Sequence, residues 1–477
     1  MSDRISHMKI IVSFIVCGLL IMSYGAYAQD SVNGKKQLSE QAFFSIVRGF
    51  HPVMKQAQIA VDKARASLVM ARAGFDPVFY FNNNQKTFDG KNYYRYINPE
   101  LKIPTWYGIE LKAGTENNNG INADSELSPG QSSYLGISVP LAKNLLMDKR
   151  RAALKQAKIM VNLSDAERRM MINDLLYEAG SAYWNWVRNY EVKQRVDDMV
   201  TVSRDRFNLV KIGYRQGDRP ALDTTEALAQ LQQFEFMQSE ALVNLQVSGL
   251  ELSNFLWAEG DRFYQLDSTI VPDMLWQTNV NNDMTPLADL LAQATVSHPA
   301  LAMYEQKLQA LRIERKLKFQ DLLPKIDLSA NLLNKGYNVF NKIGGNFYEN
   351  NNKFGISLGL PLRLSEGRGG YKLAGLKLKE TGLEMEMKRQ SVVNKLSAYF
   401  QEMTGLQKQV DIYGLATDNF EKLARGENLR FRAGEGTLFL VNSRENKLLE
   451  ARQKLIELKT KWQKSKLAVQ WAAGVLK

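Results

Sequence analysis

Long stretches of the chain place apolar residues at alternating spacings of three and four, which is the spacing of one face of an α-helix. They predict helices over about 52–74, 143–216, 220–257, 299–322, 367–433 and 437–475. The predicted helix over 143–216 contains no proline and would extend on the order of 110 Å at 1.5 Å per residue. The pattern therefore predicts a mainly helical protein with unusually long helices.

Shorter stretches alternate apolar with small or polar residues at period two, which is typical of β-strands. Leu135, Ile137 and Val139 alternate with small and polar neighbours, and the same pattern recurs over 326–332 and 354–360. These stretches predict strand regions over about 77–140 and 324–361. Strands of this kind suit either a half-buried soluble sheet or a sheet with lipid on one side and water on the other.

The chain also repeats itself, which indicates a duplicated unit. His51-Pro52 is followed 25 residues later by a second proline, and His298-Pro299 is followed in the same way. The run from Tyr214 to Asp218 resembles the run from Phe431 to Glu435, at an offset of 217 residues. We expect two copies of a helix, β-hairpin, long helix and helix, over 29–265 and 286–477, joined by a connector over 266–285.

The two predicted hairpin regions differ in length. Pro140 lies 63 residues after Pro77, whereas Pro361 lies 37 residues after Pro324. The excess in the first copy includes a period-two run from Tyr107 to Ala113. It predicts one extra hairpin, either outside the main sheet or within it.

The first residues have the composition of a secretory signal peptide. Arg4 and Lys9 precede an apolar run over 10–22, and Ala26 and Ala28 form a small-x-small site. We predict a signal peptide over 1–28, in preference to a membrane anchor, and the single cysteine lies within it. No later segment has the length and apolarity of a spanning helix. A mature protein in a membrane would therefore be a β-barrel to which several chains contribute.

Composition argues against catalysis. The chain has three His and one Cys among 477 residues, so little metal or nucleophile chemistry is available. Phosphate-binding glycine loops and paired histidines are missing from the sequence, and the Gly-x-Ser-x-Gly match at 355–359 lies inside the predicted strand over 354–360, not at a turn from a strand into a helix. His51 and His298 occupy equivalent positions before a proline and are interpreted as structural. We expect no enzyme activity, no catalytic residue, no cofactor and no metal.

The net charge of +12 raises the question of nucleic-acid binding. The predicted signal peptide argues against it, and the basic residues are spread along helices, as Lys372, Lys377 and Lys379 are. A solvated helix surface is the simpler interpretation.

The duplicated His-Pro starts, the runs Val139-Pro140-Leu141 and Leu360-Pro361-Leu362, and the paired glycine turns resemble the TolC-like outer membrane efflux protein family. The resemblance covers about 38–475. It implies a homotrimer in which an outer membrane β-barrel, usually with four strands per chain, continues into a long α-helical periplasmic tunnel. It also implies an exit duct for efflux or type I secretion. The implied partners are a periplasmic adaptor, an inner-membrane pump or secretion ATPase, and outer membrane lipid.

The resemblance places two turns at the periplasmic tip of the tunnel, where the adaptor would dock. The candidate docking residues are Gly217, Asp218, Gly434, Glu435 and Gly436. Helix punctuation also explains these residues, because Gly ends a helix and Asp or Thr can begin the next one.

Acidic residues near this tip are candidates for a gate, again by resemblance. Copy one has Asp223 and Glu226, six and nine positions after Gly217, and Arg219 and Arg444 are candidates to offset their charge. Copy two has Leu440 and Ser443 at the equivalent positions. Because copy two lacks the acids, stabilisation of a helix N-terminus is the favoured interpretation of the pair.

A periplasmic coiled-coil adaptor or scaffold protein is the alternative from another class. It would also combine a signal peptide with long helical hairpins. Two copies, each with its own strands, favour the channel. The transported substrate is not encoded in any pattern that we recognise.

Overall fold

The computed structural model describes residues 36–121, 130–274, 285–337 and 351–477. The predicted signal peptide, the lone Cys17 and part of the predicted connector lie outside these residues. The chain forms two compact units, and each unit takes three segments of the sequence. We call Met1–His51, Ala179–Asp283 and Gln409–Lys461 the helical unit, and Pro52–Glu178, Met284–Lys408 and Trp462–Lys477 the sheet unit. Each unit combines both predicted copies, whose duplication stays a prediction.

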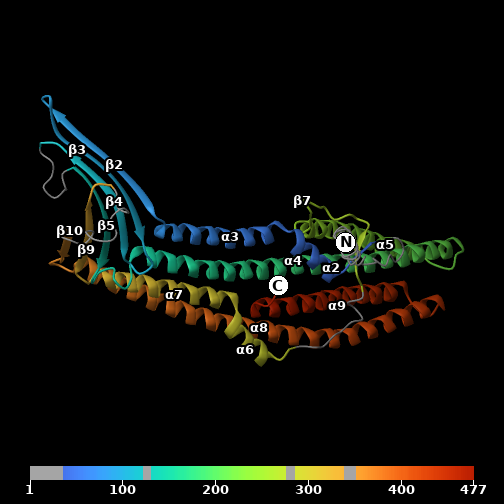
Figure 1. Ribbon diagram of the computed structural model, residues 1–477. Coiled ribbons are helices and arrows are strands. Elements are labelled where there is room, and N and C mark those ends of the chain that lie inside the picture. The colour runs from blue at the N-terminus through green and yellow to red at the C-terminus, as the bar shows by residue number, and fades with distance from the viewer. Residues whose placement is uncertain (1–35, 122–129, 275–284, 338–350) are drawn as a thin grey trace, which may run out of the picture. The chain divides into compact units, whose positions relative to one another are not determined.

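Three long helices contribute to both units. They are α4 (Lys149–Arg215), α8 (Ser365–Arg432) and α9 (Leu438–Ala473), as Figure 1 shows. α4 and α8 contain 67 and 68 residues, close to the lengths expected from the sequence pattern. Among the described residues, none of the helices is both long and apolar enough to cross a bilayer.

α4 begins six residues later in the chain than predicted, at Lys149 instead of residue 143, and hydrogen bonding explains the difference. The amides of Leu141 and Lys143 donate to the carbonyls of Ile326 and Pro324, so the chain here still pairs with the segment leading into a strand. Asn144 then adopts a positive φ of 72°. The helix begins only after Asp148, whose carboxylate accepts from the amide of Arg151 at 2.7 Å.

In its described residues, the sheet unit contains the helices α3 (Pro52–Arg72), α6 (Leu287–Ser297) and α7 (Pro299–Gln320) besides its parts of the long ones, with a 3₁₀ turn at Ala73–Phe75. Its strands are β2 (Val78–Phe88), β3 (Lys91–Pro104), β4 (Glu110–Asn119), β5 (Gly130–Pro140), β9 (Lys325–Lys335) and β10 (Asn352–Gly359). They form one antiparallel sheet in the order β10-β9-β5-β4-β3-β2 (Figure 1).

The extra hairpin of the first copy is real and lies within this sheet, since β3 pairs with β2 on one side and β4 on the other. Among the described residues, this sheet therefore has six strands, where the resemblance implied four per chain. The period-two run predicted from Tyr107 starts later, at Glu110, because a turn occupies the preceding residues. In that turn Gly108 has a φ of 84°, and the Thr105 hydroxyl donates to the Ile109 carbonyl at 2.7 Å.

The helical unit contains α2 (Glu40–Phe50), α5 (Ala221–Ser253) and its parts of the long helices. Short strands complete it: β1 (Lys36–Leu38) pairs in parallel with β8 (Ile270–Pro272), and β6 (Trp257–Ala258) pairs with β7 (Arg262–Phe263). Clusters of buried apolar residues from several helices contribute to its core. One of them joins Val210, Ala227, Phe431, Leu438 and Val441 from the four helices α4, α5, α8 and α9.

Both histidines before a proline are buried, as a structural role requires. His298 caps α7, because its Nδ1 accepts from the amide of Ala300 at 3.1 Å. Burial, with smaller contributions from nearby Lys388 and Lys395, lowers the pKa of His298 to about 4. His51 ends α2, and its ring stacks on Phe255 with 6.0 Å between the ring centroids.

Candidate functional site

The two glycine turns of the helical unit have the same geometry. Gly217 and Gly434 both have a backbone φ of 83°, an angle that residues other than glycine rarely adopt. The amide of Asp218 donates to the carbonyl of Gly213, and the amide of Glu435 donates to that of Arg430, at 2.9 Å in both cases. Both long helices therefore end in the same Schellman motif, which satisfies their last carbonyls.

The starts of the following helices differ. Thr437 begins α9 as expected, because its hydroxyl accepts from the amide of Leu440 at 3.4 Å. The expectation that Asp218 could begin α5 is wrong: α5 starts at Ala221 after Pro220, which has no side chain to accept a hydrogen bond. The ring of Pro220 fixes its own φ angle at the start of α5. Asp218 lies before it, exposed in the turn. A polar side chain is thus free to meet solvent or a partner.

Arg219 connects the first turn to the end of α8. Its Nη1 lies 3.4 Å from Oδ2 of Asp223, one helical turn away. Its guanidinium carbon also lies 4.1 Å from the centroid of the buried Phe431 ring. The arginine thus offsets the charge of Asp223 while it stacks on an aromatic face, a cation–π arrangement.

Glu226 takes part in a polar network that crosses three helices. The Asn442 side-chain amide of α9 donates to Oε1 of Glu226 at 3.1 Å. Nη1 of Arg206, on α4, donates to Oδ1 of the same Asn442 at 3.2 Å and to Oε2 of Glu445 at 2.7 Å. Arg206 and Glu445 are each only 7% exposed at the side chain. The carboxylate of Glu226 is therefore held by the neighbouring helix.

The remaining gate candidate, Arg444, has no such partner among the described residues. Arg444 is half-buried on α9, and in the described part of the chain it forms no ion pair. Among the described residues, Arg444 therefore forms no ion pair with Asp223 or Glu226. Ser443 is exposed, and Leu440 is 38% exposed.

Sequence reasoning missed Arg206, Asn442 and Glu445, although the repeat contains a signal. At an offset of 217, the position equivalent to Arg206 is Leu423, and the position equivalent to Glu445 is Leu228. Two charges of opposite sign thus stand where the predicted repeat has leucines. Such paired departures from the repeat indicate residues that meet in space.

The two faces of the sheet differ in chemistry. Along one face the register aligns Ile137 with Leu111 and Ala330. A parallel row runs across five strands through Leu332, Leu135, Ala113, Leu101 and Phe79. On the edge strand β10, Phe354, Ile356 and Leu358 of this face are 63%, 64% and 70% exposed. The other face has polar rows, which include Glu100, Lys102, Lys112, Asp327 and Asn331. Within the described residues, the apolar side chains of the edge strand β10 on this face are therefore exposed.

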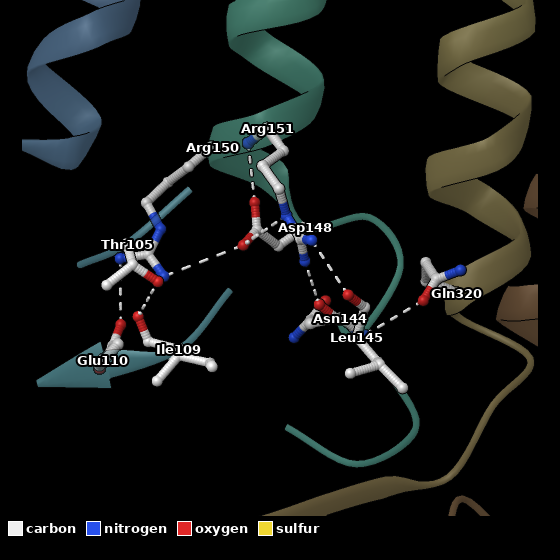
Figure 2. Close-up of polar contacts among 9 residues, drawn as sticks. All are labelled: Thr105, Ile109, Glu110, Asn144, Leu145, Asp148, Arg150, Arg151 and Gln320. Carbon is white, nitrogen blue, oxygen red and sulfur yellow. Dashed lines mark hydrogen bonds and ion pairs between the residues drawn. The ribbon is translucent and has the colours of Figure 1, made fainter. Parts of the chain in front are cut away.

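A polar cluster joins this sheet to α4 (Figure 2). Nη1 of Arg150 lies 3.0 Å from Oε1 of Glu110 at the start of β4. The guanidinium of Arg151 donates to the carbonyls of Leu145, at 3.0 Å, and of Asn144, and its Nε lies 3.3 Å from Oδ2 of Asp148. Arg150 thereby ties the first turn of α4 to β4, and Arg151 ties it to the segment between β5 and α4.

The same cluster reaches the end of α7. The Asn144 amide donates to Oε1 of Gln320, the last residue of α7, at 3.2 Å (Figure 2). Gln320 is 2% exposed, so this bond satisfies a buried polar group. Across the described residues, no group of three or more His, Cys, Asp or Glu side chains is arranged to hold a metal ion.

Comparison with known proteins agrees with this geometry. The family model described as "Outer membrane efflux protein" matches residues 108–256 and 290–475. A comparison with curated protein sequences gave no significant match. Among solved structures, the chain is similar to the Campylobacter jejuni CmeC outer membrane channel, with 14% identity, 92% of this chain and 86% of that chain covered, and a TM-score of 0.66.

Two further solved structures show the same fold. VceC, an outer membrane protein of Vibrio cholerae, matches at 15% identity over 91% of this chain and 96% of its own, with a TM-score of 0.64. The Neisseria gonorrhoeae MtrE outer membrane channel, in its open state, matches at 15% identity over 92% and 89%, with a TM-score of 0.65.

The chain therefore has the fold of outer membrane channels, and it belongs to the outer membrane efflux protein family. Its place in the cell is the outer membrane. It is a channel-family protein and not an enzyme. The family match also decides against the alternative of a periplasmic adaptor or scaffold.

Proposed function

We propose that three copies of this chain form an outer membrane exit duct, which receives substrate from an inner-membrane pump or secretion ATPase through a periplasmic adaptor. The observation that supports it best is the six-stranded sheet, with one open apolar face and one polar face. Lipid would contact the apolar face and water the polar face. The long helices would form the periplasmic tunnel.

The edges of the sheet explain why several copies are needed. Within the described residues β2 pairs only with β3, and β10 pairs only with β9. All eleven residues of β2 are exposed. Unpaired backbone groups in a bilayer are costly, so β2 of one copy would pair with β10 of the next until the ring closes.

The extra hairpin widens the proposed barrel. Three six-stranded sheets supply eighteen strands, a number at which barrels enclose an aqueous channel. Four strands per chain would give a narrower pore. The duct proposed here is therefore wider at the membrane than the family resemblance alone implied.

The tip residues retain their proposed roles. Gly217, Asp218, Gly434 and Glu435 are exposed in the two turns, with Gly436 half-buried beside them, and adaptor docking would use this surface. Asp223 and Glu226 would narrow the channel at the same end. Arg219 already offsets the charge of Asp223 within the chain.

Cysteine pairs test the arrangement of the barrel directly. Asn82→Cys in β2, combined with Gly355→Cys or Ser357→Cys in β10, should give disulfides between chains, with dimer and trimer bands and no larger species. Thr115→Cys in the middle strand β4, with the same β10 partners, is the control. Planar-bilayer recordings of the purified protein should show a water-filled pore.

Two results would contradict the proposal. Cross-linked ladders that extend beyond three chains would exclude a closed trimer. A protein that is purified from the outer membrane fraction but never conducts ions would exclude a duct.

A further inference from the structure

A groove of about 630 Å³ opens in the sheet unit, near the place where the strands end. Leu146 lies six residues after β5, and Phe319 lies six residues before β9. Residues of α4, of α7, of α8 and of the segment between β5 and α4 line it. They are Leu146, Met147, Lys155, Arg312, Arg315, Lys316, Phe319, Gln320, Tyr371 and Leu378.

The charged residues that line the groove are all cationic. Lys155, Arg312, Arg315 and Lys316 line it, and no Asp or Glu does. In the described portion of the chain, these four side chains form no ion pair with a carboxylate. Four positive charges around one groove repel each other, and a bound anion relieves that repulsion.

The nearest carboxylates on the same segment are already engaged. Glu314 of α7 pairs with Lys377 at 3.5 Å, and Asp321, which follows α7, pairs with Lys143 at 2.9 Å. Neither is among the lining residues. The positive charge of the groove is therefore not neutralised by its own surroundings.

The rest of the lining is apolar or aromatic. Leu146 is 73% exposed and Phe319 is 43% exposed. Nη2 of Arg315 donates to the Tyr371 hydroxyl at 2.9 Å, and its guanidinium carbon lies 5.0 Å from the ring centroid. An inorganic anion would leave Leu146 and Phe319 in water. A ligand with an anionic head and an apolar tail would use both parts of the groove.

We propose that this groove binds an anionic phospholipid of the membrane leaflet that faces the periplasm. The phosphate would lie among Arg312, Arg315 and Lys316, and an acyl chain would cover Leu146 and Phe319. The proposal rests on the proposed function, because it requires the sheet to span the outer membrane. The first helical turns below the strands then fall at the depth of the headgroups, where aromatic and basic side chains are favoured.

Native mass spectrometry of the full-length protein in detergent tests the proposal. Added phosphatidylglycerol should be retained at this site and phosphatidylcholine should not. The double variant Arg312→Gln with Lys316→Gln should weaken phosphatidylglycerol binding by about tenfold or more. The matched control, Lys372→Gln with Lys379→Gln, removes the same charge from exposed positions of α8 outside the groove and should bind like the wild type.

Phosphatidylglycerol with a photoactivatable acyl chain locates the site. We expect adducts on peptides that contain Leu146 or Phe319. Equal binding of the two lipids, equal loss in the groove and control variants, full competition by inorganic phosphate, or adducts confined to the sheet would each overturn the proposal. Recording pore conductance from the same preparations separates the two ideas. Conducting variants with unaltered lipid binding refute only the lipid site, whereas a wild type that does not conduct refutes the duct.

Discussion

Arg206 of α4 and Glu445 of α9 form a buried two-point ion pair, one contact of which is 2.7 Å long. The equivalent positions in the predicted repeat are Leu423 and Leu228, which carry no charge. Asn442 extends it to Glu226 on α5. This network sets the spacing of three helices just inside the glycine turns.

Removing one partner of this pair should be costly. Glu445→Ala leaves Arg206 buried and unpaired, and we expect a loss of about 3–5 kcal/mol in the free energy of unfolding. The thermal unfolding midpoint of the purified protein measures the effect. Glu450→Ala is the control, because its pair with Lys447 is exposed and should cost less than about 1 kcal/mol.

Replacing both charges by the residues of the other copy should be tolerated. Arg206→Leu combined with Glu445→Leu leaves no buried charge, and such exchanges are often neutral or stabilising. We expect the double variant to unfold at a clearly higher temperature than Glu445→Ala alone. Equal midpoints would show that the cost comes from packing and not from the uncompensated charge.

Neutralising the two acidic gate candidates should reduce the barrier to ion flow at the tip of the channel. Asp223→Asn with Glu226→Gln removes two carboxylates from each chain and should raise single-channel conductance while it lowers cation selectivity. Glu235→Gln is the control, since Glu235 lies on the same helix and pairs with Arg204 at the surface. Unchanged conductance and selectivity would leave the acids with a helix-stabilising role only.

Lowering the pH should lower the free energy of unfolding of the sheet unit, because His298 is buried in its neutral form. Because burial lowers its pKa from 6.5 to about 4, the unfolded chain binds the proton more tightly between these values. The neutral imidazole of His298 makes its full contribution to the free energy of unfolding above pH 6.5. This contribution is lost as the pH falls from 6.5 towards 4. Between pH 7.5 and 4.5 the loss is about 2–3 kcal/mol.

His298→Asn provides the comparison. Asparagine can still cap α7 and does not titrate, so its thermal midpoint should fall less steeply over this pH range. Lys388 and Lys395, the charged groups that act on His298, are present in both proteins. Parallel pH profiles for the two proteins would rule out His298 as the cause.

Glycine at the second turn should be required for its backbone angle. Gly434→Ala places a side chain at a φ of 83° and should cost about 1–2 kcal/mol, seen as a lower unfolding midpoint. Gly426→Ala lies within α8, where a Cβ would meet nothing within 4 Å. It should stabilise by up to about 1 kcal/mol. Opposite signs for the two changes are the expected result.

Much of this protein could be predicted from its sequence. Helical spacing, period-two strands and glycine turns are local patterns, so they placed the long helices, the strand regions and the Schellman turns at Gly217 and Gly434 within a few residues. The excess length between Pro77 and Pro140 predicted a further hairpin. Its place was open, because one spacing suits a strand inside or outside the sheet.

Only the tertiary structure decided which residues meet. The start of α4 depends on pairing between Lys143 and the segment before β9, and the network at Arg206 joins residues more than 200 positions apart. Both depend on contacts between segments that are distant in the chain, and a local periodicity in the sequence carries no information about such contacts. The same holds for the sheet order that puts the extra strands between β2 and β5, and for the four cations that α4 and α7 bring to one groove.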